Sequence, residues 1–344
     1  MTLTLAEALT TRPNDHSRLR EEFEARTGIA WHAPTPATLA AGHALSIVIP
    51  ARNTAHSLGP VLDALAAQDT NGSVETIVVD DASEDATAEI AAAHPAVDTL
   101  IRLRTQSGAA AARNAGTALA SADTVVYLDG DMVLAPHVLA DIATRSRPDA
   151  VLLGFRHNAP YQPGRDGVAK VPGGMPDLAA DHRVTWRSQG GKQMYTGITL
   201  DRPTTGSPLN DTDDFQKLGH GTTYLDWDLP RVVVTALMAA PREKVVDVGG
   251  FDPVFGLVGW GMEDTHLGAA LISAGCLVVP LRQCVGFHLD PPDAEAQWQT
   301  KLAGWPSTLA YYRRLLDGPV PHSRTTAFRD AAKQLLAESE VINR

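Results

Sequence analysis

The sequence predicts an α/β fold whose first half is a doubly wound sheet, with parallel strands that alternate with helices. Short apolar runs, each followed by a loop, indicate four strands: residues 45–49, 75–79, 100–103 and 124–128. Apolar residues at helical spacing indicate the helices between them: residues 57–68, 85–94 and 109–120. Strands and helices that alternate at intervals of about 30 residues imply parallel pairing through crossover helices.

The composition is that of an ordinary globular protein. The chain has 344 residues, 44% hydrophobic and 20% charged, which is enough for one large α/β domain or for two domains. Its 29 basic and 40 acidic residues give a net charge of −11, so the surface as a whole should repel nucleic acid and acidic lipid headgroups. The longest apolar run, residues 232–240, is too short to span a membrane, and the N-terminus lacks the pattern of a signal peptide. Cys276 and Cys284 are expected to be small core residues, which fits a soluble protein of the reducing cytoplasm.

Residues 1–43 are expected to form a helical N-terminal extension. Ser17 can cap a helix, and Pro34 and Pro36 then interrupt the chain before the first strand. The apolar residues of this extension, Trp31 included, should pack on the main domain or on a second subunit. A homodimer is therefore one expectation.

The second half of the chain is less regular. Residues 155–230 are rich in Gly, Pro and Asp, and we interpret them as a variable wall that faces the second substrate. Asp226 and Asp228 form an Asp-x-Asp pattern without a preceding strand, so we favour a surface or acceptor-side role over metal binding. The remaining elements are expected as strands at residues 232–238, 277–281 and 285–289, and as helices at residues 242–246, 263–274, 308–316 and 325–338.

Two acids follow the apolar strand at residues 124–128, with Gly130 between Asp129 and Asp131. Ligands of open α/β sheets bind at the carboxyl ends of the strands. Two carboxylates there repel each other, and a divalent ion bound to oxygen ligands and to a nucleotide diphosphate would relieve that cost. The alternative is a simple Asp-Gly turn, which fits the tripeptide equally well.

The loop after the first strand, PARNTAHS at residues 50–57, contains no glycine. A nicotinamide-binding domain has Gly-x-Gly-x-x-Gly at this place, so that a pyrophosphate can approach a helix N-terminus. Nucleotidyl transferases also use a glycine-rich loop after the first strand. The loop therefore argues against both classes.

Five segments in order resemble family 2 glycosyltransferases of the GT-A fold. They read IPARN, VVDDASEDAT, GAAAARNAG, DGD and GGFDPVFGLVGWGMED, and the resemblance covers residues 45–290 apart from the middle loops. It implies a Rossmann-like fold of nucleotide-diphospho-sugar transferases, with a mixed central sheet flanked by helices and with helical extensions at both ends. Residues 44–154 would form the nucleotide-sugar-binding half, residues 155–300 the acceptor-binding and catalytic half of the same domain, and residues 301–344 the C-terminal helices.

The resemblance also implies which residues bind the donor: Pro50, Arg52, Asn53, Asp80, Asp81, Arg113, Asp129, Gly130, Asp131 and Trp260. Asp80 and Asp81 would accept from the N–H of a uracil ring, although acids after a strand also cap the following helix. Arg113 would reach the diphosphate or the base with its planar donor fork, whereas on a solvated face it would have no function. Trp260 offers a ring face on which a sugar can stack.

For the metal, the resemblance implies Asp131 and Asp129, with His288 as a third ligand, and oxygen ligands suit Mn²⁺ or Mg²⁺ better than Zn²⁺. A lone histidine is more often a structural residue. Glu263 and Asp264 start a helix, where acids are ordinarily dipole partners. In the family, however, the carboxylate of this motif is the general base, so Asp264 is expected to take the acceptor's proton and Glu263 to hold hydroxyl groups.

These expectations describe a metal-dependent glycosyltransferase that moves a sugar from a nucleotide-diphosphate sugar, a UDP-sugar first, to an acceptor hydroxyl with inversion. Two alternatives stay open: a retaining transferase of the same fold that acts on a peptide or a natural product, and a sugar-nucleotide-binding protein without turnover. His266 and Leu237 depart from the residues common in the family, so the acceptor is not implied. No nucleic-acid partner and no integral membrane segment are expected.

Overall fold

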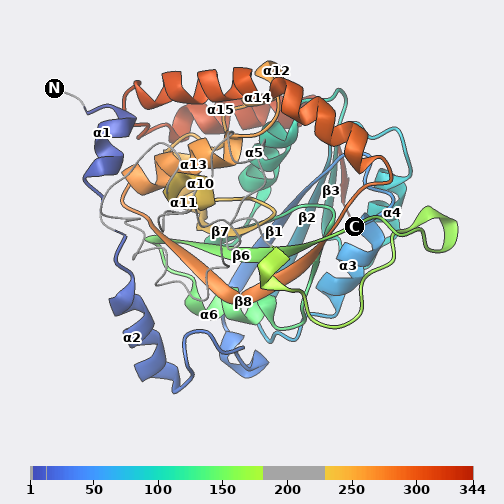
Figure 1. The fold of residues 1–344 in the computed structure, drawn as a ribbon, viewed down its shortest axis with the longest axis horizontal. Helices are drawn as coiled ribbons and strands as arrows, with labels where there is room; N and C mark the ends of the chain where they lie inside the picture. The colour runs from blue at the N-terminus through green and yellow to red at the C-terminus, as the bar shows by residue number, and fades with distance from the viewer. Residues whose placement is uncertain (1–2, 13, 181–228, 344) are drawn as a thin grey trace.

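A nine-stranded mixed sheet with helices on both faces organises the chain (Figure 1). The computed structural model describes residues 3–12, 14–180 and 229–343. The strands are β1 (Ala44–Ala51), β2 (Ser73–Asp80), β3 (Thr99–Leu103), β4 (Thr124–Leu128), β5 (Met132–Leu134), β6 (Ala150–Ala159), β7 (Leu237–Pro241), β8 (Leu277–Leu289) and β9 (Ser339–Asn343). Their order across the sheet is β5-β8-β6-β7-β4-β1-β2-β3-β9. The predicted α/β class and mixed sheet are confirmed.

The central strands β1, β2, β3 and β4 are parallel, as the alternation of strands and helices predicts. Antiparallel strands complete the sheet: β7 pairs with β4 and β6, β5 with β8, and β9 with β3. The pair β6 and β8 is parallel. Because β1, β2 and β4 run in one direction, their carboxyl ends meet at the same edge of the sheet, where ligands of such folds bind.

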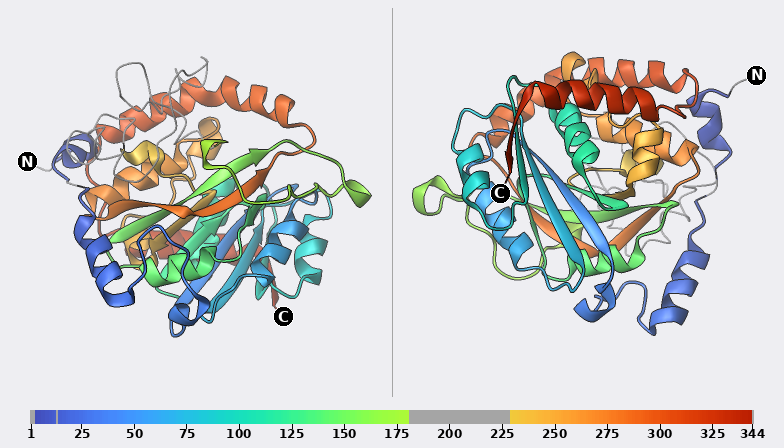
Figure 2. Two further views of the ribbon diagram at one scale, coloured as in Figure 1. Left: turned by 60° about the horizontal axis from the view of Figure 1, so that its bottom comes forward. Right: turned by 180° about the vertical axis from the view of Figure 1, so that it is seen from behind.

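Helices α3, α4 and α6 cover one face of the sheet, and α5, α11, α13 and α15 cover the other (Figure 2). The helices are α1 (Leu5–Thr10), α2 (Ser17–Thr27), α3 (Leu58–Ala66), α4 (Thr87–Ala93), α5 (Ala109–Leu119), α6 (Val138–Arg145), α10 (Leu229–Val232), α11 (Arg242–Asp247), α12 (Phe255–Val258), α13 (Glu263–Ser273), α14 (Ala294–Leu316) and α15 (Thr325–Ala337). Short 3₁₀ helices are η1 (Ala37–Ala40), η2 (Arg165–Gly167) and η3 (Leu178–Ala180).

This two-sided cover explains why the central strands are continuously apolar. Neighbouring residues of a strand point to opposite faces, so a strand exposed on one face would alternate between apolar and polar residues. Ile47, Val48 and Ile49 of β1 all have no exposed surface. Both cysteines, Cys276 and Cys284, are also buried core residues, as expected.

The predicted strand at residues 232–238 is wrong. Leu229–Val232 forms the short helix α10, and the strand β7 begins only at Leu237. A short apolar run is compatible with a buried helical turn and with a buried strand, and periodicity alone does not separate them.

The strand β8 joins two predicted strands, residues 277–281 and 285–289, into one of 13 residues. Its partner β6, which was not predicted, follows this length through a register shift between Leu153 and Phe155. Gly154 lies at the shift, and a Cβ atom there would come within 2.1 Å of a leucine side chain of β7. Close packing therefore requires glycine at this position.

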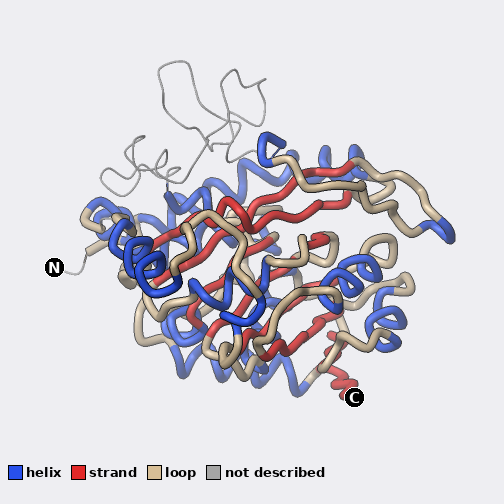
Figure 3. The backbone as a smooth tube through the Cα atoms, turned by 90° about the horizontal axis from the view of Figure 1, so that it is seen from below, coloured by secondary structure: helices blue, strands red, loops and turns tan. Residues whose placement is uncertain are grey.

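Several elements were not predicted because tertiary contacts stabilise them more than local sequence does: α1, β5, α6 and β9. Strand β9 illustrates this, since it is the C-terminal segment and pairs with the edge of β3 (Figure 3). Helix α14 begins at Ala294 rather than at residue 308. Helix α2 begins at Ser17, so Ser17 is not its cap, and the Ser17 amide instead donates to Asp15 Oδ1 at 2.9 Å.

The N-terminal extension is helical and packs on the main body. Trp31 is 1% exposed, and its carbonyl oxygen accepts hydrogen bonds from Arg145 of α6.

The expected division of the chain at residues 154 and 300 stays a prediction. Strand β6 runs across the first of these positions and helix α14 across the second. Residues 181–228, which make up most of the expected variable wall and include the second Asp-x-Asp pattern at 226–228, lie outside the described residues. In the described part of the chain, no helix is long and apolar enough to cross a membrane.

Candidate functional site

The candidate site lies where β4 ends. Strand β4 delivers Asp129 and Asp131, and the chain then turns into β5, with the Met132 amide donating to the Asp129 carbonyl at 3.0 Å. Because β5 pairs antiparallel with β8, Met132 lies opposite His288. The Leu289 amide donates to the Asp131 carbonyl at 2.8 Å, which fixes the two segments together.

This pairing brings the three predicted metal ligands into one group. One side-chain atom from each of Asp129, Asp131 and His288 lies within 4.8 Å of the others. His288 Nε2 is 3.3 Å from Asp131 Oδ1, and both side chains are 22% exposed. The sheet thus joins residues that are 157 and 159 positions apart in the sequence, from 288 − 131 and 288 − 129.

Arg113 of α5 connects this group to the start of α13. Its Nη2 donates to Asp129 Oδ1 at 2.9 Å, and its Nη1 donates to Glu263 Oε1 at 3.4 Å. The guanidinium carbon lies 5.5 Å from the centroid of the Phe251 ring, which packs edge-on against Tyr127. Arg113 is 5% exposed, so packing and two charged partners hold its side chain in place.

The two acids of the Asp-Gly-Asp segment differ in their protonation. Burial raises the pKa of Asp131 to about 7, and the charge of Asp129 acts in the same direction. Burial also opposes ionisation of Asp129, but the charge and hydrogen bond of Arg113, with the charges of His288 and Arg156, together outweigh it and lower the pKa of Asp129. Burial lowers the pKa of His288 to about 4, so its imidazole is neutral near pH 7 and can act as a ligand. The pKa of Glu263 is raised by burial and by the charge of Asp264.

The first loop and the end of β2 form a second network beside this group. Arg52 Nη1 donates to the carbonyl oxygens of Asp81 and Ala82, at 2.7 and 2.8 Å. Asn53 Oδ1 accepts from the Glu84 amide at 2.8 Å. Pro50 lies beside them in β1, half-buried and paired with Val79 of β2. The network fixes the shape of this loop, which the sequence only predicted to face the nucleotide base.

Asp80 and Asp81 are both buried, and both already have partners. Asp81 accepts from the amides of Ser107 and Gly108 at 2.6 and 2.8 Å, and so orders the loop that leads into α5. Asp80 has no exposed surface and accepts from the Ser83 amide at 3.2 Å. Their role in base recognition stays a prediction. The hydrogen bonds described here are compatible with it, because each carboxylate oxygen can accept more than one hydrogen bond.

The opposite wall comes from the start of α13. Met262 has a φ of +74° in the left-handed region, and this turn places Glu263 and Asp264 on the first turn of the helix. Asp264 Oδ1 accepts from the amide of Thr265 at 2.7 Å. Arg113 thus connects Glu263 to the group Asp129, Asp131 and His288, which we call the metal-ligand group. The hydrogen bonds described for Asp264 are to its neighbour Thr265.

An aromatic corner stands beside this wall. Trp260 is 40% exposed, and the centroid of its ring lies 6.0 Å from that of Trp298, at an interplanar angle of 76°, and 6.3 Å from that of Trp305. Lys301 Nζ lies 5.1 Å from the centroid of the Trp260 ring. Trp260 was singled out from the sequence, whereas the residues of α14 were not.

Two features of the sequence indicate that the residues of α14 belong to this corner. Trp298, Lys301 and Trp305 recur at helical spacing in a segment that was not predicted to be a helix. Gly304 lets α14 approach the loop before α13, since a Cβ there would lie 3.1 Å from the backbone of Gly259. Arg156 of β6 also acts on the site, because its charge lowers the pKa of Asp131.

Comparisons with known proteins show a family match and a similar fold. Residues 46–192 match the family model described as Glycosyl transferase family 2. An uncharacterized glycosyltransferase of Bacillus subtilis, YfnE, is 28% identical over 265 residues, which cover 72% of this chain and 65% of that protein. Validoxylamine A glucosyltransferase of Streptomyces hygroscopicus subsp. jinggangensis is 26% identical over 257 residues, which cover 71% of this chain and 55% of that protein. The match thus spans less than two thirds of the length of either relative.

A solved structure supports the fold. The mannosyltransferase PcManGT from Pyrobaculum calidifontis, in complex with GDP-Man and Mn²⁺, superposes with a TM-score of 0.50 at 21% identity, over 97% of this chain and 85% of that chain. The order of the five sequence motifs, the mixed sheet and the family match point to one conclusion. Residues 46–192 of the chain therefore match a glycosyl transferase family 2 domain, and the chain has the GT-A fold.

Proposed function

We propose that this protein transfers a sugar from a nucleoside diphosphate sugar to an acceptor hydroxyl, with Mn²⁺ or Mg²⁺ bound at the end of β4. The observation that carries the proposal is the group Asp129, Asp131 and His288, connected through Arg113 to Glu263 on the opposite wall. A donor phosphate beside the metal-ligand group would have the acids of α13 across the site. That is the arrangement that a transfer to an acceptor needs.

The donor atoms fit a divalent cation. Among the described residues, Asp131 Oδ1 and His288 Nδ1 are buried without a hydrogen-bond partner. Buried polar atoms normally have one, so Asp131 Oδ1, which lies 3.3 Å from His288 Nε2, marks a place where a ligand would supply the missing interaction. Carboxylates suit both Mg²⁺ and Mn²⁺, and an imidazole favours Mn²⁺. A bound ion would stabilise the negative charge that develops on the leaving diphosphate.

Arg113 acts in this proposal mainly as a positioning residue. Its guanidinium holds Asp129 and Glu263 at fixed places on the two walls, and its positive charge lies beside the expected diphosphate. Contact with the diphosphate itself remains part of the proposal. Lysine would not replace it, because a single ammonium group cannot hold two carboxylates with the same planar fork.

Asp264 is proposed as the general base and Glu263 as the residue that holds a hydroxyl group. The acceptor oxygen bonds to the anomeric carbon as the bond from that carbon to the diphosphate breaks, and the hydroxyl proton passes to the Asp264 carboxylate. Attack opposite the leaving group inverts the anomeric carbon. The exposed ring of Trp260 would support the sugar or the acceptor during this step.

The donor is proposed to be a UDP-sugar. Since one relative is named a validoxylamine A glucosyltransferase, UDP-glucose is the first donor to test. A thermal-shift panel of UDP, GDP, dTDP and their glucose esters, with and without Mn²⁺, identifies the base. A ligand present at about 100 times its dissociation constant adds about 2.7 kcal/mol to the free energy of unfolding, which such a panel detects.

The decisive experiment compares the Asp264→Asn and Glu263→Gln variants by the metal-dependent release of nucleotide and by UDP binding. Removing a general base lowers turnover by about 10²–10⁴-fold, while donor binding should stay unchanged. Full turnover in Asp264→Asn would refute its assignment as the base. Proton NMR of the first-formed product gives the anomeric configuration, and retention would exclude the inverting mechanism.

A further inference from the structure

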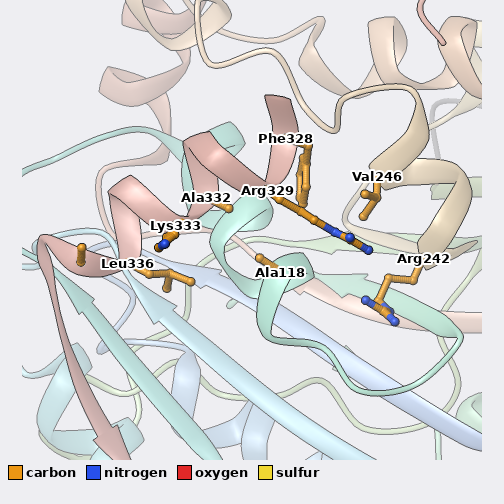
Figure 4. Close-up of a pocket in the computed structure, with 9 residues that line it drawn as sticks. Ala118, Arg242, Val246, Phe328, Arg329, Ala332, Lys333 and Leu336 are labelled. Carbon is orange, nitrogen blue, oxygen red and sulfur yellow. The ribbon is translucent and has the colours of Figure 1, made fainter. Parts of the chain in front are cut away.

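A groove of about 530 Å³ lies away from the candidate site, between α15, α11 and the C-terminal end of α5 (Figure 4). Ala118 lines it, five residues beyond Arg113 on α5. Arg242, also in the lining, is anchored through its amide to the carbonyl of Asp123, just before β4 starts. The groove therefore lies at the amino edge of the sheet, opposite the edge where β4 ends.

The floor of this groove is apolar. Val246, Phe328 and Ala332 form a small hydrophobic cluster of their own and are 7%, 4% and 4% exposed, and Ala118 packs against them. The main core does not include these residues. An aliphatic group on this floor would replace water next to the Phe328 ring, which is favourable in proportion to the apolar area that it covers.

The rim of the groove is basic. Arg242, Arg329 and Lys333 line it, and no acid is among the described lining residues. Figure 4 shows the guanidinium groups of Arg242 and Arg329 extending toward the same end of the groove, from α11 and α15. The Arg242 side chain is anchored by its Nε, which donates to the Ala122 carbonyl at 3.1 Å and leaves its terminal nitrogens for a ligand.

The acid whose pKa Arg242 influences, Glu75, already has its own partners. The charge of Glu75 acts on Arg242, but its carboxylate accepts hydrogen bonds from Ser46 and Ser121. The rim thus concentrates positive charge on a chain with a net charge of −11. Two guanidinium groups beside an apolar floor match an anion that carries an aliphatic chain.

We propose that this groove binds an alkyl phosphate, with the phosphate between Arg242 and Arg329 and the aliphatic chain along Phe328. Such a ligand is either a free phosphate monoester or the headgroup region of an anionic lipid. The proposal is independent of the transfer reaction, because the groove shares no lining residue with the candidate site.

The test uses isothermal titration calorimetry of the full chain in EDTA, which prevents metal-assisted phosphate binding at Asp131. Ethyl phosphate, octyl phosphate and neutral octyl glucoside are the probes. We expect octyl phosphate to bind at least about tenfold more tightly than ethyl phosphate, because each methylene group adds apolar contact. Octyl glucoside should not bind measurably, because it lacks the charge.

The variant Arg329→Gln should weaken octyl phosphate binding by about tenfold or more, since charge-assisted hydrogen bonds to the phosphate are lost. Arg329 is exposed on α15, so the substitution should leave the fold intact, which circular dichroism checks. The matched control is Arg282→Gln, an exposed arginine on β8 that does not line the groove. Equal binding by Arg329→Gln and the parent protein would refute the proposal, as would equal binding of octyl glucoside.

Vesicles separate the two sources of the ligand. A lipid surface is the ligand if the protein sediments with phosphatidylcholine vesicles that contain phosphatidic acid. This sedimentation should be lost in Arg329→Gln and should not occur with vesicles that lack phosphatidic acid. Octyl phosphate binding without vesicle binding identifies a free phosphate monoester. If neither octyl phosphate nor the vesicles bind, the groove is not an anion site.

Discussion

Two buried groups of charges illustrate how differently the same residue types serve this protein. In the first, Arg145 and Asp141 of α6 are both fully buried and lie 2.7 Å apart. In the second, Asp129, Asp131 and His288 meet at the end of β4. Both groups contain a carboxylate whose pKa burial raises, at Asp141 and at Asp131.

The groups differ in how completely the polar atoms are paired. Arg145 donates to the carbonyls of Trp31 and Ala33, to the hydroxyl of Thr35 and to Asp141, so each of its nitrogens has an acceptor. Its guanidinium also lies 4.0 Å from the centroid of the Phe23 ring. This group fastens the N-terminal extension to the main body, and its guanidinium has no nitrogen left without an acceptor.

The metal-ligand group is paired only in part. Arg113 neutralises Asp129, but Asp131 has no cation with hydrogen-bond geometry among the described residues, and an atom of His288 also has no partner there. A buried carboxylate in this state costs folding free energy. Each group has one buried carboxylate oxygen without a hydrogen-bond partner, Asp141 Oδ2 and Asp131 Oδ1. The comparison teaches that a guanidinium bonded directly to the carboxylate, as Arg145 is to Asp141, distinguishes the structural ion pair from the candidate ligand site.

The largest effect is expected for Asp131→Asn. Turnover should fall by about 10²–10³-fold or more, because the loss of charge stabilisation at a reacting group has that magnitude. Above about pH 7, where Asp131 is ionised, the free energy of unfolding in EDTA should not fall, because the substitution removes a buried charge that has no bonded cation. Initial rates and urea unfolding measure the two quantities. A marked loss of stability with full turnover would show that Asp131 is a structural residue and not part of a ligand site.

The second prediction concerns the paired group. Arg145→Met leaves the buried Asp141 carboxylate without its cation, so the free energy of unfolding should fall by about 3–5 kcal/mol. UDP binding by the folded fraction should not change. The control is Arg147→Gln, which removes a solvent-screened pairing with Glu22 in which both side chains are more than 40% exposed, so its effect on stability should be far smaller. Equal effects of the two substitutions, measured by urea unfolding, would contradict the assignment.

The third prediction is a pH dependence of metal binding. A metal ligand must be deprotonated, and the pKa of Asp131 is about 7 before an ion binds. The affinity for Mn²⁺ should therefore fall by up to about tenfold for each pH unit below 7, as one proton competes with the ion. Calorimetric titrations with Mn²⁺ between about pH 6 and about pH 8, where most proteins are stable, measure this change in affinity.

The Asp131 carboxyl also makes the stability of the protein depend on pH in EDTA. The pKa of Asp131 is higher in the folded state than in the unfolded state, so at pH values between the two the folded state holds a proton that the unfolded state has released. Stability from this group is therefore present at low pH and is lost as the pH rises through about 7. The difference between the parent protein and Asp131→Asn isolates this contribution, and a difference that grows in favour of the parent above pH 7 would contradict it.

The smallest effect is expected at the aromatic corner, where Lys301 lies over the Trp260 ring and Arg231 over the Trp305 ring. Trp298→Ala removes the ring that packs edge-on against Trp260, a contact worth about 0.5–1.5 kcal/mol. The Michaelis constant for the acceptor should rise by about 2–12-fold, while UDP binding should not change. Gln299→Ala, at the exposed neighbouring position, is the control. A change in UDP binding alone would move this corner to the donor side.

The site residues that follow strands were accessible to sequence reasoning, because an apolar run that ends in acids marks the rim of a sheet. Asp129 and Asp131 were found in this way, and the alternation of elements predicted the parallel order of β1 to β4. Residues on α14 were not found. Lys301 and Trp298 acquire their place only because Gly304 lets this helix approach the loop at Gly259.

The sequence by itself determined the α/β class, the acids at the end of β4 and the family motifs, since each depends on residues close together in the chain. Only the tertiary structure decided that β5 pairs with β8 and brings His288 to Asp131, that Arg113 joins Asp129 to Glu263, and that Arg145 is fully paired. The physical reason is that pairing between distant segments depends on packing and hydrogen bonding in three dimensions, for which local periodicity carries no signal.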